Sequence, residues 1–126
     1  MTPFIANIIK QGCPTVDIGA PFIEILQTLA KAHTGTLVVV DKNRKVMGIL
    51  SERDIVRHLS RQKSVESCTA KNLMTKNIIS ADSKVTSSGL MALMVQNNIR
   101  HVPIINDGEL LGLVSITDVI TRLLDK

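Results

Sequence analysis

The chain has 126 residues, enough for one compact domain with a buried core, and its 44% of apolar residues exclude a disordered chain. The net charge of +4 is modest, and the absence of Trp and Tyr disfavours nucleic-acid binding, which uses aromatic side chains for stacking. The sequence has no stretch of 18 apolar residues, so no membrane-spanning helix is expected. Cys13 and Cys68 form no CxxC pair and are expected to be reduced thiols of a cytoplasmic protein.

The first half of the chain predicts a strand, a helix, a hairpin and a second helix. Apolar residues between positions 22 and 29 recur with the 3.6-residue period of a helix. The apolar runs 37–40 and 46–50 flank the polar turn 41–45, an arrangement typical of a β-hairpin. Apolar residues at helical spacing return after Asp54 and predict the second helix.

The second half of the chain predicts the same order of elements. Helical spacing covers residues 90–94, and the β-rich runs 102–105 and 110–114 flank a turn that contains Asp107-Gly108. Helical spacing returns over residues 119–124. Each half of the chain therefore reads as strand, helix, strand, strand, helix.

The clearest feature of the sequence is a repeated segment. Residues 48–54 recur as residues 112–118, and the Gly, Ser and Asp of this segment keep one offset of 64. We therefore predict two β-α-β-β-α repeats, residues 5–62 and 63–126, with a polar linker at about 60–71. Since a single repeat is too small to bury its own sheet, the two are expected to pack into one α/β (α+β) module with pseudo-twofold symmetry and a ligand cleft between the repeats.

The repeated Ser-x-x-Asp pattern has two interpretations. Before an apolar run it resembles a helix capping box, in which Ser51 or Ser115 caps a helix and Asp54 or Asp118 lies in the positive first turn. A helix N-terminus is also an anion site, where a serine hydroxyl can donate to phosphate. The two oxygens of a carboxylate suit the paired hydroxyls of a ribose, so capping and ligand binding can coexist.

The order of strand, turn, strand, Gly-x-x-Ser-x-x-Asp and helix resembles the cystathionine-β-synthase (CBS) domain, which occurs in pairs. Residues 100–103 (Arg-His-Val-Pro) match the strand signature of that family, and residues 73–75 (Leu-Met-Thr) resemble the opening of its second repeat. Residues 51–57 are similar to the version found in small stand-alone bacterial pairs, and Val38 stands where the family has proline. The resemblance covers residues 5 to about 124.

The resemblance implies a nucleotide site in each repeat, where the serine contacts phosphate or ribose and the aspartate contacts ribose hydroxyls. The second site is expected to be the stronger, because Asp17 stands in the first repeat where the second has Ser80, and an acid repels phosphate. The candidate nucleotide-binding residues are Ser80, Arg100, His101, Val102, Pro103, Ser115, Thr117 and Asp118 in the second repeat, and Ser51, Arg53 and Asp54 in the first.

We expect a regulatory module that senses an adenine nucleotide such as AMP, ADP, ATP or NAD, and that has no catalytic residues, metal or cofactor. The sequence contains no Gly-x-x-x-x-Gly-Lys, Gly-x-Gly-x-x-Gly or His-Glu-x-x-His motif. Two alternatives stay open: a dimerisation module without ligand, and an uncharacterised enzyme. Surplus apolar residues over 90–95 and 116–124 predict a homodimer. The chain shows no effector domain, so an effector protein or a further domain is implied.

Overall fold

The computed structural model describes residues 2–32, 35–61 and 64–124. Backbone contacts divide the chain into two compact units, each described here by itself. One unit is Pro14–Ile78, and the other combines Met1–Cys13 with Ile79–Lys126. The N-terminal segment therefore packs with the second repeat, and the segment that follows the first repeat packs with the first.

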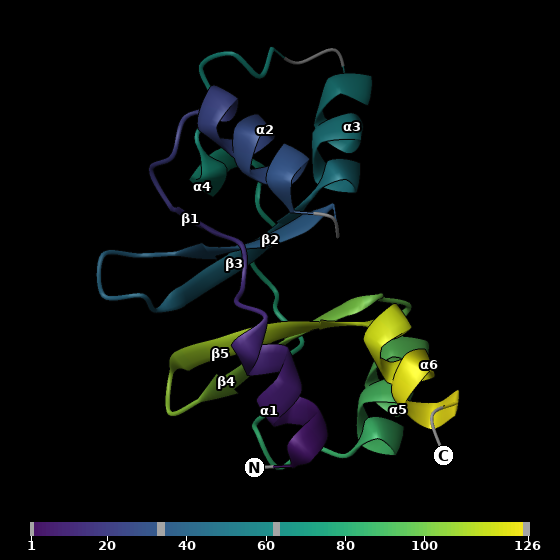
Figure 1. Cartoon of the computed structure of the whole chain (residues 1–126). Coiled ribbons are helices and arrows are strands. Elements are labelled where there is room, and N and C mark those ends of the chain that lie inside the picture. Colours follow the sequence, from purple (N-terminus) through teal and green to yellow (C-terminus); the bar gives the residue numbers. More distant parts are fainter. Residues whose placement is uncertain (1, 33–34, 62–63, 125–126) are drawn as a thin grey trace. The chain divides into compact units, whose positions relative to one another are not determined.

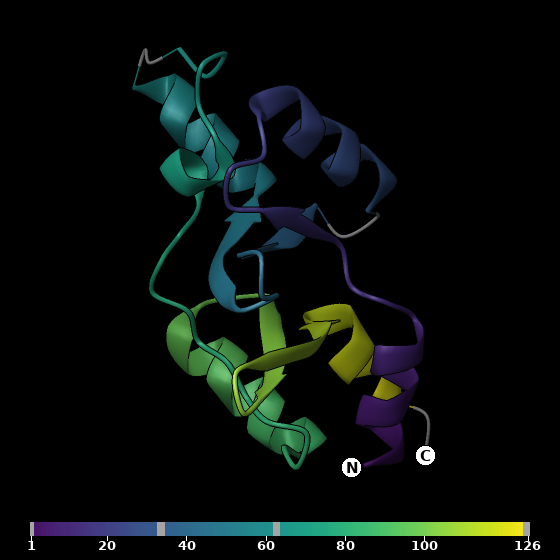
Figure 2. The same cartoon turned by 90° about the vertical axis from the view of Figure 1, so that its left-hand side faces the viewer.

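The unit Pro14–Ile78 is a three-stranded sheet with helices on one face (Figure 1). Its strand order is β1-β2-β3, with β1 parallel and β3 antiparallel to β2. Figure 2 shows α2 and α3 on the same face of this sheet. The elements are β1 (Thr15–Asp17), α2 (Phe22–Lys31), β2 (Thr36–Val40), β3 (Val46–Ser51), α3 (Glu52–Ser60) and α4 (Ala70–Leu73).

Strand β2 is buried along its whole length because it lies between β1 and β3. Its sequence, Thr-Leu-Val-Val-Val, is rich in the β-branched residues that favour central strands. Leu37 and Val39 point into the core on the helix-covered face, where they join Ile25 of α2 and Ile55 of α3. The alternation along the strand thus fixes which side chains form this core.

The other unit is built on the hairpin of β4 (His101–Asn106) and β5 (Glu109–Ser115). Three helices pack with it: α1 (Pro3–Lys10), α5 (Ser87–Asn97) and α6 (Ile116–Leu124) (Figure 1). Its core is aliphatic except for Phe4. The buried members are Phe4, Ile5, Ile8, Leu90, Met94, Val102, Ile104, Val114 and Val119.

The two predicted hairpins are confirmed. Asp107 and Gly108 have φ of 49° and 81°, as a two-residue turn that matches the strand twist requires. The longer turn of the first hairpin places Arg44 at φ 62° and is held by Asp41, whose carboxylate accepts from the Asn43 and Lys45 amides. In each turn, the chain reverses at a residue whose backbone has the left-handed conformation.

The helix and hairpin predictions are confirmed, but two details differ. The strand expected before α5 is reduced to one bridge, because Ala81 alone pairs with Ile104. Helices α1 and α4 were not predicted. Thr2 caps α1 by accepting the Ile5 amide at 3.2 Å, and Pro3 occupies its first turn.

Candidate functional site

The Ser-x-x-Asp motif of the first repeat forms a capping box at the start of α3. The Asp54 amide donates to Ser51 Oγ at 3.3 Å, and the Ser51 amide donates to Asp54 Oδ2 at 2.8 Å. The Ser51 hydroxyl also lies 3.1 Å from Asp54 Oδ2. The capping interpretation of this motif is therefore confirmed, and it satisfies amides that the helix itself leaves unpaired.

The motif of the second repeat forms the same box at the start of α6. The Ser115 amide donates to Asp118 Oδ2 at 2.8 Å, and the Asp118 amide donates to Ser115 Oγ at 3.1 Å. Both helices thus begin with an ordered serine, an aspartate and the positive end of the helix dipole. This geometry can place a phosphate near the serine and a diol near the aspartate.

The two aspartates differ in their second carboxylate oxygen. Oδ1 of Asp54 accepts the Thr75 hydroxyl at 3.0 Å and lies 3.9 Å from Nη1 of Arg57. Only 10% of the Asp54 side chain is exposed. Oδ1 of Asp118 lies outside its capping box, whose hydrogen bonds use Oδ2. In both repeats, capping therefore uses Oδ2 and not Oδ1.

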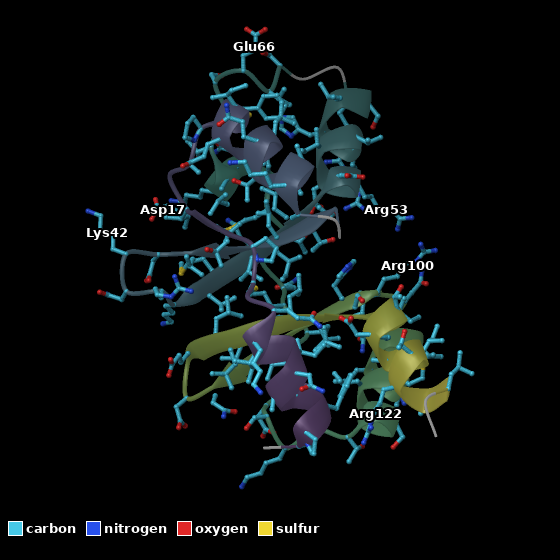
Figure 3. The ribbon with its side chains drawn as sticks, viewed as in Figure 1. Asp17, Lys42, Arg53, Glu66, Arg100 and Arg122 are labelled. Atoms are coloured by element: carbon cyan, nitrogen blue, oxygen red, sulfur yellow. The ribbon has the colours of Figure 1, made fainter. Side chains whose placement is uncertain are left out.

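Arg100 and His101 lie next to the second-repeat motif. The Ile116 amide donates to the Arg100 carbonyl at 2.8 Å, which fixes the start of β4 against the start of α6. His101 pairs in register with Ser115 across the hairpin. Figure 3 shows the Arg100 side chain projecting outward beside the start of α6. A guanidinium and an imidazole thus flank the helix N-terminus that carries Ser115.

The charge state of His101 is set by its surroundings. Burial lowers the pKa of His101 below its usual 6.5, and neighbouring Arg100 lowers it further, while Asp118 opposes both effects. The histidine is therefore neutral at pH 7, with one ring nitrogen as donor and the other as acceptor. The influence of Asp118 also shows that the imidazole and the carboxylate are close in space.

The remaining candidates of the second repeat differ in how they can reach a ligand. Ser80 and Thr117 are exposed. Ser80 precedes Ala81, whose amide donates to the Pro103 carbonyl at 3.1 Å, so Ser80 lies near the middle of β4. Val102 is fully buried in the core, and Pro103 is also buried. The Val102 side chain therefore packs in the core, and a ligand could contact this residue only through its backbone.

The candidate residues fall into two sets. Residues 80, 100–103, 115, 117 and 118 belong to one unit, whereas Ser51, Arg53 and Asp54 belong to the other. Arg53 is exposed in the first turn of α3 and points outward in Figure 3. Thr75 was not among the predicted site residues, although the sequence analysis had noted the Leu-Met-Thr segment that contains it.

Within residues 2–32, 35–61 and 64–124, none of the helices has the length and hydropathy needed to cross a bilayer. The same residues contain no group of three or more His, Cys, Asp or Glu side chains arranged to hold a metal ion.

Comparison with known proteins identifies the repeats. The model of the CBS domain family matches the chain twice, over residues 5–61 and 70–125. The chain belongs to the CBS domain family. The tandem match and the fold make it a CBS pair, as the resemblance implied. A crystal structure of the CBS-domain protein ATU1752 from Agrobacterium tumefaciens is 29% identical and superposes with a TM-score of 0.83, covering 94% of this chain and 92% of that one.

Two further relatives are similar over most of the chain. The CBS domain pair of protein MJ0100, solved with 5′-methylthioadenosine and S-adenosyl-L-methionine, is 27% identical with a TM-score of 0.82, and the match covers 96% of this chain and 94% of that one. An uncharacterized 17.7 kDa protein of Acidianus ambivalens is 38% identical over 105 residues, or 81% of this chain. The chain spans 62% of the length of that relative and 37% and 51% of the next two curated relatives.

Proposed function

We propose that this CBS pair is a regulatory module that binds an adenine nucleotide through the second-repeat motif. The observation that carries the proposal is the arrangement at the start of α6, where Ser115 and Asp118 form an ordered box beside Arg100 and His101. The helix N-terminus and Arg100 attract phosphate, and Asp118 offers an acceptor for ribose hydroxyls. The adenosine-containing ligands of the MJ0100 pair support the same ligand class.

The proposed role is regulatory and not catalytic. Serine, aspartate and arginine bind ribose and phosphate, and the capping bonds hold Ser115 and Asp118 in place when no ligand is present. A bound nucleotide then changes the stability or assembly of the module, and an effector protein or a further domain reads this change in the cytoplasm. AMP is the first ligand to test because it carries one phosphate and an unmodified ribose.

Thermal unfolding tests the proposed ligand class. A nucleotide present at 100 times its dissociation constant stabilises the folded state by about 2.7 kcal/mol. For a domain of this size, the melting temperature should rise by about 10 °C. The melt is recorded with AMP, ADP, ATP, NAD and S-adenosylmethionine after removal of any copurified ligand. If none of them changes the melting temperature at millimolar concentration, the proposal is wrong.

The same chain is proposed to form a homodimer through α5 and α6. Of the apolar residues predicted to mark this interface, Leu90, Met94 and Val119 are instead buried in the core of their own unit. Val95 on α5 and Leu124 on α6 remain 69% and 80% exposed, and Ile120 and Leu123 of α6 are also exposed. An apolar surface of this kind is typical of a protein interface.

Light scattering tests the dimer. At micromolar concentration, the mass is expected to be about twice that of one chain, and Val95→Asp with Ile120→Asp should reduce it to the monomer mass, because a buried unpaired charge opposes association. Val56→Asp is the matched control, since Val56 is 64% exposed on α3. A wild-type chain that is monomeric, or a control that dissociates equally, would contradict this interface.

A further inference from the structure

The hydrogen bond from Thr75 to Asp54 joins two segments that lie 21 residues apart in the chain. It uses Oδ1 of Asp54, while Oδ2 is engaged by the amide and hydroxyl of Ser51. Both oxygens of the first-repeat aspartate are therefore already accepting hydrogen bonds. A ribose hydroxyl that binds to Oδ1 has to share this oxygen with Thr75, since one carboxylate oxygen can accept two hydrogen bonds.

The position of Thr75 does not depend on its hydroxyl. The Thr75 amide donates to the Ile49 carbonyl at 2.8 Å, and the Ile49 amide donates to the Thr75 carbonyl at 3.0 Å. These two backbone bonds hold residue 75 against β3, next to the helix that carries Asp54. These backbone bonds place the Thr75 side chain next to Asp54, where its hydroxyl donates to the oxygen that a ribose hydroxyl would use.

We infer that Thr75 is a latch that occupies the ribose-binding oxygen of Asp54 and so controls access to the first-repeat motif. The inference rests on the proposed function only in taking the aspartate of the motif as the ribose ligand. A ribose hydroxyl at the first repeat must share Oδ1 with the Thr75 hydroxyl, which weakens the ribose–Asp54 bond. Thr75 lies in the segment that ends this unit at Ile78.

Oδ1 lies outside the capping box in both repeats, and in the first repeat it accepts the Thr75 hydroxyl. Arg57 contributes little at Oδ1, because its side chain is 53% exposed and its Nη1 lies 3.9 Å away. Thr75 therefore provides the stronger of the two contacts at this oxygen.

The test is an AMP titration of the full chain followed by the backbone amide NMR signals of Ser51 and Asp54. Thr75→Val keeps the shape of the side chain and removes the hydroxyl, which frees Oδ1. The dissociation constant reported by these two amides should fall by about 5-fold relative to wild type, the factor for one hydrogen bond of about 1 kcal/mol. Thr75→Ser retains a hydroxyl and should bind like wild type.

Thr28→Val is the matched control, because the Thr28 hydroxyl donates to the Glu24 carbonyl within α2. It should leave the titration unchanged, and Thr75→Ala repeats the test if the valine variant does not fold. Unchanged or weaker binding at Ser51 and Asp54 in the hydroxyl-free variants would overturn the inference, as would the absence of AMP binding there in every variant. Signals of residues 115–118 in the same spectra report the proposed second-repeat function separately.

Discussion

Replacing Asp118 with alanine is expected to weaken the tighter binding of an adenine nucleotide by roughly 10- to 150-fold, whereas Asp54→Ala leaves that binding nearly unchanged. The loss corresponds to about 1.5–3 kcal/mol for a charge-assisted pair of hydrogen bonds to ribose. Arg100 and His101 flank the start of α6, while Oδ1 of Asp54 already accepts the Thr75 hydroxyl. Isothermal titration calorimetry of the two variants measures the difference.

The two variants control for each other, because each removes the aspartate of one capping box. Asp54→Ala also removes the Thr75 hydrogen bond, so the free energy of unfolding of each variant separates a loss of stability from a loss of ligand contact. Equal losses of affinity would show that the repeats are equivalent. A larger loss in Asp54→Ala would show that the first repeat holds the tighter site.

Gly48→Ala is expected to lower the free energy of unfolding by about 1–3 kcal/mol, the usual cost of overpacking a filled site. A Cβ atom at Gly48 would lie 2.6 Å from Sδ of Met74 and 2.8 Å from the Thr75 carbonyl oxygen. The methionine can move, but the carbonyl accepts the Ile49 amide and is held against β3. The strain therefore falls on the backbone of the segment that carries Thr75.

Gly112→Ala is the control from the equivalent position of the second repeat. A Cβ atom there would meet Cγ2 of Ile8 at 3.4 Å, an ordinary van der Waals contact. Its free energy of unfolding should stay within about 0.5 kcal/mol of wild type. Urea unfolding of both variants measures the contrast, and similar values for the two glycines would be evidence against the close approach at β3.

Local patterns in the sequence predicted the elements that depend on local physics. The 3.6-residue spacing, the β-rich runs and Asp107-Gly108 located the principal helices and both hairpins, and the Ser-x-x-Asp spacing predicted two capping boxes. These signals lie within a few residues of the structure that they specify. The repeat of Gly, Ser and Asp then related the two halves of the chain.

What the sequence did not reveal depends on contacts between distant segments. The packing of α1 with the second repeat rests on contacts such as Ile8 against Gly112, which no periodicity encodes. The latch at Asp54 depends equally on a distant residue, Thr75. Val102 stays a predicted nucleotide-binding residue, but the alternation along β4 directs its side chain into the core and leaves its backbone for a ligand. The Arg-His-Val-Pro motif located strand β4, but the alternation of side chains along the strand determines which of them can face a ligand.

Amide NMR mapping with AMP shows directly whether an adenine nucleotide binds at the start of α6. After removal of any copurified nucleotide, AMP is titrated into the isotope-labelled chain. Saturable shifts are expected that are largest at Arg100, Ser115, Thr117 and Asp118 and that appear at lower concentration than shifts at Ser51 and Asp54. Unchanged signals of Arg100 and residues 115–118 at millimolar AMP, or a first repeat that responds at lower concentration, would contradict nucleotide binding at the start of α6.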